Sequence, residues 1–151
     1  MDDAQAQLDG FIDKYTPEMA ALTRMLLARL KARLPGAVIL VYDNYNALAI
    51  GFAAADRVKD VILSIAVYPK WANLFFMQGR WLDDPHGLLK GEGSMVRHVP
   101  AVTEAVFDDP RIDALIEAAL DQAERPINPA GAGGLIIKSV SARQRPRRPN
   151  G

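Results

Sequence analysis

The stretch VILSIAVYPKWANLFFM, residues 61–77, decides the expected fold because two apolar runs are interrupted only by Pro69 and Lys70. Branched aliphatic and aromatic residues dominate both runs, which is typical of strands. A parallel neighbour would need a crossover of about a dozen residues or more. The two-residue break therefore predicts two antiparallel strands joined by a short turn.

The chain around this pair supplies further strands. Apolar runs at residues 37–42, 47–53 and 96–102 predict three more. The sequence DNYN at residues 43–46 predicts a turn between the first two of them. The last run is expected at an edge of the sheet, because Pro100 cannot donate a ladder hydrogen bond.

Three amphipathic segments predict helices. The first has apolar residues at the i, i+3, i+4 and i+7 positions of one helical face, namely Leu8, Phe11, Ile12 and Tyr15. The second is expected to begin after Thr16 as N-cap, with Pro17 at its first position. The third repeats this pattern with Asp109 and Pro110. We therefore predict an α+β fold, with an antiparallel sheet of about five strands and an N-terminal helix pair and a C-terminal helix packed on it.

The composition is that of one small folded domain. The chain has 151 residues, 50% of them hydrophobic, and no cysteine, which excludes disulfides and thiolate chemistry. The apolar stretches are far shorter than the roughly 20 residues that span a bilayer, and the N-terminus has no signal-peptide pattern. We therefore expect a cytoplasmic protein that does not bind membranes.

The balanced overall charge hides an asymmetry between two parts of the chain. Residues 135–151 carry five basic side chains and no acidic one, so residues 1–134 have a net charge of −5. The sequence NPAGAGG at residues 128–134 is typical of a flexible linker. We therefore divide the chain into an α+β domain at residues 1–125 and a flexible linker with a disordered basic tail at residues 126–151.

The expected strands are apolar on both faces. An antiparallel sheet with one face in water normally alternates apolar and polar residues, and residues 61–68 do not. Three helices cover one face, so the other face needs the long loop at residues 78–95, a ligand or a second subunit. We expect a homodimer, and the other two coverings stay open.

Several motifs resemble one known family. They are LVYDNYNALAIGF at residues 40–52, VILSIAVYPKWANLFF at residues 61–76, DDPHGLLKGEGSMVRHV at residues 83–99 and the tail GLIIKSVSARQRPRRP at residues 134–149. Together they resemble the YdhG-like family of unknown function. The resemblance implies an α+β fold with helices packed on an antiparallel sheet. Some members of that family are described as frataxin-like intracellular iron chaperones, so the resemblance also implies iron handling.

A glycine-rich loop followed by basic residues is the first candidate site. Backbone N–H groups in such a loop and fixed cations both favour an anionic ligand. The candidate residues are Lys90, Gly91, Gly93, Arg97 and His98. Their spacing matches neither a P-loop nor a dinucleotide-binding fingerprint, and a tight surface turn is the alternative.

Acidic residues near the N-terminus are the candidate metal ligands. On a helix, Asp9 and Asp13 would offer carboxylate oxygens to weakly held ferrous iron. The alternative is an ordinary solvated helix face.

The tail and the aromatic residues are the remaining candidates. The tail would contact nucleic acid or an acidic partner through Arg143, Arg145, Arg147 and Arg148. A pocket or stacking platform would be lined by Tyr42, Tyr45, Trp71, Phe75 and Trp81, for which core packing is the alternative.

The sequence contains no catalytic motif, so we expect binding rather than catalysis. No serine lies in a G-x-S-x-G context, and the only histidines, His86 and His98, are not spaced as metal ligands on a helix. The leading interpretation is a small cytoplasmic module that binds a small anionic ligand or iron. The alternative is an interaction protein whose basic tail docks on nucleic acid or an acidic partner.

Overall fold

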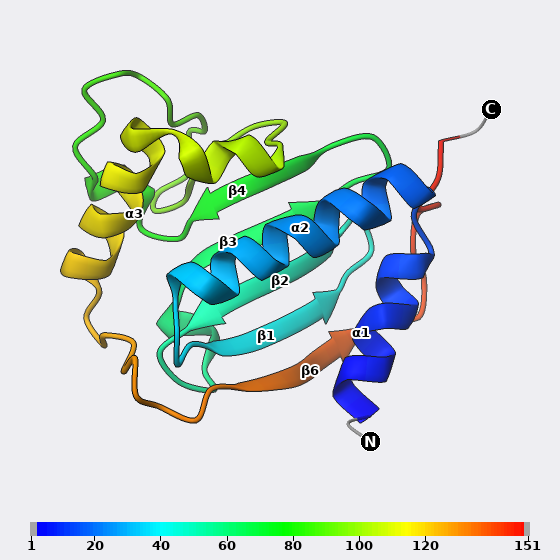
Figure 1. Cartoon of the computed structure of the whole chain (residues 1–151). Coiled ribbons are helices and arrows are strands. Elements are labelled where there is room, and N and C mark those ends of the chain that lie inside the picture. Colours follow the sequence, from blue (N-terminus) through cyan, green and yellow to red (C-terminus); the bar gives the residue numbers. More distant parts are fainter. Residues whose placement is uncertain (1–2, 150–151) are drawn as a thin grey trace.

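The computed structural model describes residues 3–149 as an α+β fold in which three α-helices pack on a six-stranded mixed sheet (Figure 1). The strand order is β5-β4-β3-β2-β1-β6. The strands are β1 (Val38–Asp43), β2 (Leu48–Ala53), β3 (Val61–Val67), β4 (Ala72–Phe76), β5 (Arg97–Val99) and β6 (Gly134–Val140). The helices are α1 (Asp3–Asp13), α2 (Pro17–Arg33) and α3 (Pro110–Gln122), with short 3-10 turns η1 (Val58–Asp60), η2 (Gly79–Trp81) and η3 (Glu104–Asp108).

Strands β1 to β4 form the antiparallel meander that the sequence predicts. Each of them pairs antiparallel with the next along the chain. Ile50, Ile65 and Leu74 lie opposite one another across three strands and are all fully buried. The antiparallel pair predicted from residues 61–77 is therefore confirmed.

The prediction of a five-stranded, purely antiparallel sheet is wrong at one edge. β6 pairs in parallel with β1, and Leu135 and Ile136 lie opposite Ile39 and Leu40. The connection between the two strands contains α3 and most of the sheet, so it is long enough for a crossover. Residues 135–137 form a short apolar run in a segment expected to be disordered, and nothing local in the sequence shows that β1 offers it an edge.

The helix starts predicted from capping residues are confirmed. The hydroxyl oxygen of Thr16 accepts a hydrogen bond from the backbone N–H of Met19 at 3.2 Å. The carboxylate of Asp109 likewise accepts from the backbone N–H of Arg111 at 2.9 Å. A proline follows each cap, where its fixed φ fits the first helical position. No helix within residues 3–149 is both long and apolar enough to cross a membrane.

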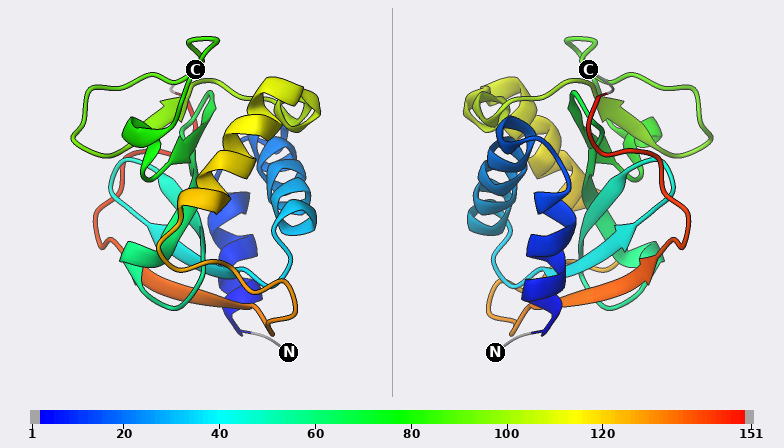
Figure 2. Two further views of the ribbon diagram at one scale, coloured as in Figure 1. Left: turned by 90° about the vertical axis from the view of Figure 1, so that its left-hand side faces the viewer. Right: turned by 90° about the vertical axis from the view of Figure 1, so that its right-hand side faces the viewer.

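The hydrophobic core lies between the helices and one face of the sheet. Figure 2 shows α1, α2 and α3 on the same side of the strands. Buried side chains from every helix and from the central strands meet there, including Ile12, Leu26, Ile65, Phe76 and Ile116. The rest of the molecule is arranged around this two-layer core.

The opposite face of the sheet carries a much smaller apolar cluster. Leu40, Ala53 and Val61 are buried in it. Ser64 and Ala66 alternate with core residues of β3, so they point to this face, where they are only 9% and 7% exposed. Small side chains therefore account for part of the apolar pattern without a covering helix. The homodimer stays a prediction.

The C-terminal segment, residues 141–149, differs from the disordered tail expected from the sequence. It lies against the turn between β1 and β2. The backbone N–H of Ser141 donates to the carbonyl of Asp43 at 2.8 Å, and that of Arg145 donates to the carbonyl of Tyr45 at 2.9 Å. Arg147 is only 5% exposed. In this structure the basic tail is packed on the body.

Candidate functional site

An open groove lies at the end of the sheet where three chain segments meet. These are the β1–β2 turn, the β3–β4 turn and the C-terminal segment, which runs past the end of α1 (Figure 1). Its volume is about 740 Å³, within the range of small-molecule sites. The lining of this C-terminal groove consists of Asn46, residues 68–71, Arg145, Pro146, Arg148 and Pro149.

An aromatic pair forms one wall of the C-terminal groove. The rings of Tyr68 and Trp71 are stacked, with their centroids 4.9 Å apart and their planes 16° apart. Both residues belong to the short turn between β3 and β4, which holds them on the end of the sheet. Trp71 nevertheless remains 43% exposed. An indole that is oriented by a neighbour and still exposed can stack with a planar ligand ring.

Cationic side chains complete the lining, and no acidic side chain joins them. They are Lys70, Arg145 and Arg148. Among the residues that the structure describes, no carboxylate pairs with Lys70 or Arg145. Arg148 donates from Nε to the carbonyl of Lys14 at 3.2 Å and from Nη2 to that of Asp13 at 3.5 Å. The groove therefore carries uncompensated positive charge, which attracts an anion.

The C-terminal segment is anchored beside the groove by a buried ion pair. The Nη2 of Arg147 lies 2.9 Å from the fully buried carboxylate of Asp43, which also pairs with the Nζ of Lys14 at 2.7 Å. Burial alone would raise the pKa of the Asp43 carboxyl, but the hydrogen bonds from Lys14 and Arg147 outweigh burial and lower the pKa below its usual value. Asp43 is therefore held in its charged form.

The ring of Tyr15 lies under the guanidinium of Arg147, whose Cζ is 5.9 Å from the ring centroid, and the hydroxyl of Tyr15 is hydrogen-bonded to two strands at this end of the sheet. Its hydroxyl donates to the carbonyl of Val67 at 2.6 Å and accepts from the N–H of Leu48 at 3.2 Å. Burial raises the pKa of Tyr15 to about 12, although the nearby charge of Arg147 acts in the opposite direction. The folded protein therefore favours the neutral phenol.

Replacing Tyr15 with phenylalanine is expected to lower the free energy of unfolding by about 1–3 kcal/mol, because two buried backbone groups lose their partner. The pKa is raised on folding, so the stability that the phenol contributes is complete below its ordinary value near 10. It should disappear as the pH rises toward 12. Urea denaturation of the wild type and Tyr15→Phe at pH 8 and at higher pH measures both effects. Tyr45→Phe, at an exposed position, is the control and should change stability by less than about 0.5 kcal/mol.

The residues of the predicted anion-binding loop lie close together in the structure, but several of their polar groups hydrogen-bond to one another. Lys90 and His98 exchange two backbone hydrogen bonds of 2.8 and 2.9 Å. The Nη1 of Arg97 donates to the carbonyls of Gly93 and Val96 at 2.6 and 2.8 Å. Loop carbonyls thus surround a cation of the chain itself. This arrangement fits the alternative of a tight turn better than an anion cradle.

The predicted metal ligands Asp9 and Asp13 lie one turn apart on α1 and have partners on the protein. Asp9 accepts from the side chain of Gln5 at 3.1 Å, and Asp13 pairs with Arg24 at 2.9 Å. Within residues 3–149, no group of three or more histidine, aspartate or glutamate side chains is placed to hold a metal ion. The described residues therefore add no support for iron binding, and the metal-ligand role of Asp9 and Asp13 stays a prediction.

The tail arginines and the aromatic candidates are divided among different environments. Of the arginines, Arg145 and Arg148 line the C-terminal groove, Arg147 is buried and Arg143 is exposed outside the groove. Of the five aromatic candidates named from the sequence, only Trp71 lines the groove. Tyr42 belongs to the small cluster on the second sheet face, Phe75 packs on His98, Tyr45 is exposed, and Trp81 lies near Arg80.

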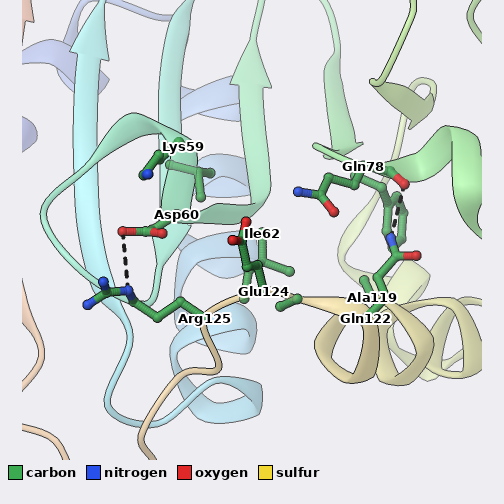
Figure 3. A pocket seen from close by; sticks show the side chains of 11 residues that line it. Lys59, Asp60, Ile62, Gln78, Ala119, Gln122, Glu124 and Arg125 are labelled. Carbon is green, nitrogen blue, oxygen red and sulfur yellow. Dashed lines mark hydrogen bonds and ion pairs between the residues drawn. The ribbon is translucent and has the colours of Figure 1, made fainter.

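A second hollow lies between η1, the end of β4 and the end of α3 (Figure 3). Gln122 donates to the carbonyl of Gln78 at 3.0 Å on one side of it, and Arg125 approaches Asp60 to 3.8 Å on the other. Its internal space is about 20 Å³, which accommodates about one water molecule. It is too small for a ligand, so the C-terminal groove is the better candidate.

Sequence reasoning named Trp71, Arg145 and Arg148 separately and missed Tyr68, Lys70 and Asn46. The missed residues lie in two turns that the sequence does predict. A turn that carries an aromatic residue on each side of Pro69-Lys70 was the available signal. What the sequence did not show is that the C-terminal segment lies beside both turns.

The chain matches no family model, no curated protein sequence and no solved structure. The resemblance to the YdhG-like family therefore stays a prediction based on the quoted motifs.

Proposed function

We propose that this protein is a binding module for a small anion that carries a planar ring, held in the C-terminal groove. The ring stacks on Trp71, and the anionic group lies against Lys70 and Arg145. One observation carries the proposal: a single groove combines an exposed indole, fixed by Tyr68, with three cations and no acid. Such a lining complements both halves of the ligand.

The two halves of the ligand are recognised by different physical effects. Stacking on an aromatic side chain contributes about 1–3 kcal/mol per nucleobase. Arginine binds phosphate or carboxylate through two parallel hydrogen bonds, and lysine acts as a point charge. A nucleoside monophosphate has a planar base and a phosphate in one small molecule, so it is the probe that fits the groove best.

The structure favours this groove over a tail that docks as a free basic arm. Arg147 is buried on Asp43, and Arg148 is held by two backbone carbonyls of the α1 end. A free arm would release counterions through all four tail arginines, whereas here two of them already have partners on the body. Binding in the groove requires only that Arg145 stay in the position that it has in this structure.

Calorimetric titration with AMP tests the proposal, with adenosine and inorganic phosphate as the two halves of the probe. We expect AMP to bind more tightly than either half. Trp71→Ala should weaken AMP binding roughly 10- to 100-fold, which corresponds to the free energy of one stacked base. Arg145→Ala should weaken AMP and phosphate alike, and raising the salt concentration should reduce its effect.

Matched variants outside the groove provide the controls. Trp81→Ala removes a tryptophan that is 57% exposed elsewhere on the surface, and Arg143→Ala removes a tail arginine outside the groove lining. Both should bind AMP as the wild type does. Equal AMP affinity in the wild type and Trp71→Ala would contradict the proposal. A short single-stranded oligonucleotide that binds when no mononucleotide does would instead favour the tail-docking alternative.

A further inference from the structure

Two of the three cations of the C-terminal groove come from a segment that the sequence predicts to be disordered. Lys70 belongs to the β3–β4 turn, but Arg145 and Arg148 are reached only after the chain leaves β6. The groove therefore exists in its complete form only while the C-terminal segment lies against the body. What holds that segment also determines whether a ligand can bind.

We infer that Arg147, which does not line the groove, is a positioning residue that fixes Arg145 and Arg148 in it. The inference rests on the proposed function. Arg147 points inward, and its Nη2 lies 2.9 Å from the buried Asp43 carboxylate. Its Nη1 also donates to the carbonyl of Tyr45 at 3.3 Å. It thus binds the same turn that supplies Asn46 to the groove.

Holding Arg147 in place also restrains Arg145 and Arg148, because they are close to it in the chain. Arg148 is its direct neighbour and Arg145 is two residues away, and a residue spans at most about 3.6 Å. Pro146 and Pro149 limit the backbone freedom on either side because their φ angles are fixed. When the guanidinium of Arg147 is held on Asp43, its two neighbours have little room to leave the groove.

The ion pair between Arg147 and Asp43 holds the C-terminal segment on the body, but one polar atom of Arg147 has no partner among the described residues. It joins two charges that are almost fully buried, with side chains 3% and 0% exposed. The Nε of Arg147, however, is buried without a hydrogen-bond partner in the described part of the chain. A segment held in this way is expected to open locally without unfolding of the core.

Ligand affinity should then follow the fraction of molecules in which the segment is closed. The apparent dissociation constant equals the intrinsic value divided by that fraction. Arg147→Met keeps an unbranched apolar stem but removes the guanidinium and its charge, so it should open the segment. We expect AMP to bind at least about tenfold more weakly to this variant, as it would if a tenth of the molecules were closed. Arg147→Lys restores the charge and should recover part of the affinity.

Amide hydrogen exchange reports on the anchor without any ligand. The N–H of Ser141 donates to the carbonyl of Asp43 at the end of β1, and that of Arg145 donates to the carbonyl of Tyr45 in the β1–β2 turn, so their exchange measures closure of the segment. In Arg147→Met both should exchange faster, while amides of β3 keep their protection if the core remains folded. Because binding and closure are linked, saturating AMP should slow exchange at Arg145 in the wild type. Arg143→Met is the matched control and should behave as the wild type does.

The outcomes separate this inference from the proposed function. Unchanged exchange at Ser141 and Arg145 in Arg147→Met would overturn the anchor itself. Faster exchange with unchanged AMP affinity would overturn the positioning role while the proposed function stands. If the wild type binds no AMP, the proposed function fails, and with it the positioning role that rests on it. Faster exchange, weaker binding and partial recovery by Arg147→Lys together support the inference.

Discussion

Removal of the Arg147 charge is expected to lower the free energy of unfolding by about 3 kcal/mol. Breaking a buried ion pair at one partner costs about 3–5 kcal/mol, because the other charge is left in the interior. Asp43 is fully buried but keeps Lys14 at 2.7 Å, so the lower end of that range applies. Chemical denaturation of the wild type and Arg147→Met at neutral pH measures the difference.

A double-mutant cycle separates the ion pair from the rest of the side chain. Asp43→Asn together with Arg147→Met should cost less than the sum of the two single substitutions, because the double variant leaves no unpaired charge in the interior; Lys14, which loses its partner, is 41% exposed. Arg143→Met is the control and should remain within about 0.5 kcal/mol of the wild type. Additive effects in the cycle would mean that the two residues do not interact in solution.

Replacing Gly36 with alanine is expected to be as damaging, for a steric reason. Gly36 follows α2 with φ at +83°, and a Cβ there would lie 1.9 Å from the carbonyl oxygen of Asn128. The left-handed conformation alone costs a non-glycine residue about 1–2 kcal/mol. The overlap with backbone adds about 1–3 kcal/mol more, because residue 128 must move. We expect a total loss of roughly 2–5 kcal/mol in the free energy of unfolding.

Gly87 supplies a matched control for this prediction. Its φ is also positive, at +64°, but a Cβ there would meet nothing within 4 Å. Gly87→Ala therefore measures the conformational cost without the clash, and the difference between the two variants measures the contact with Asn128. Equal losses would show that the segment before β6 does not pack on Gly36, and that residues 128–134 behave as the flexible linker expected from composition.

Local chemistry predicted the elements, because each signal lies within a few residues. Thr16 with Pro17 and Asp109 with Pro110 mark helix starts, and a two-residue break between apolar runs marks an antiparallel pair. These signals need no knowledge of the rest of the chain. They place the starts of α2 and α3 and the β3–β4 pair correctly, whereas Tyr15, expected on the face of the first helix, lies beyond the end of α1 at Asp13.

Contacts between distant residues account for what the sequence did not predict. The DNYN turn shows no sign that Asp43 pairs with a residue 104 positions later in the chain. The basic tail has the composition of a disordered arm, yet the buried pair and the parallel β6–β1 ladder give it a place on the body. Trp71 and Arg145 were each recognisable as candidates, but only the topology brings them into one groove.

Tryptophan fluorescence tests the central claim most directly, because Trp81→Phe leaves Trp71 as the only tryptophan of the chain. Titration of this variant with AMP should quench or shift the Trp71 emission along a saturable curve, with the affinity measured by calorimetry for the wild type. Adding Arg145→Ala should move the same curve to higher AMP concentrations. Trp71 emission that does not change at AMP concentrations where the protein is saturated would place the ligand elsewhere and contradict the account.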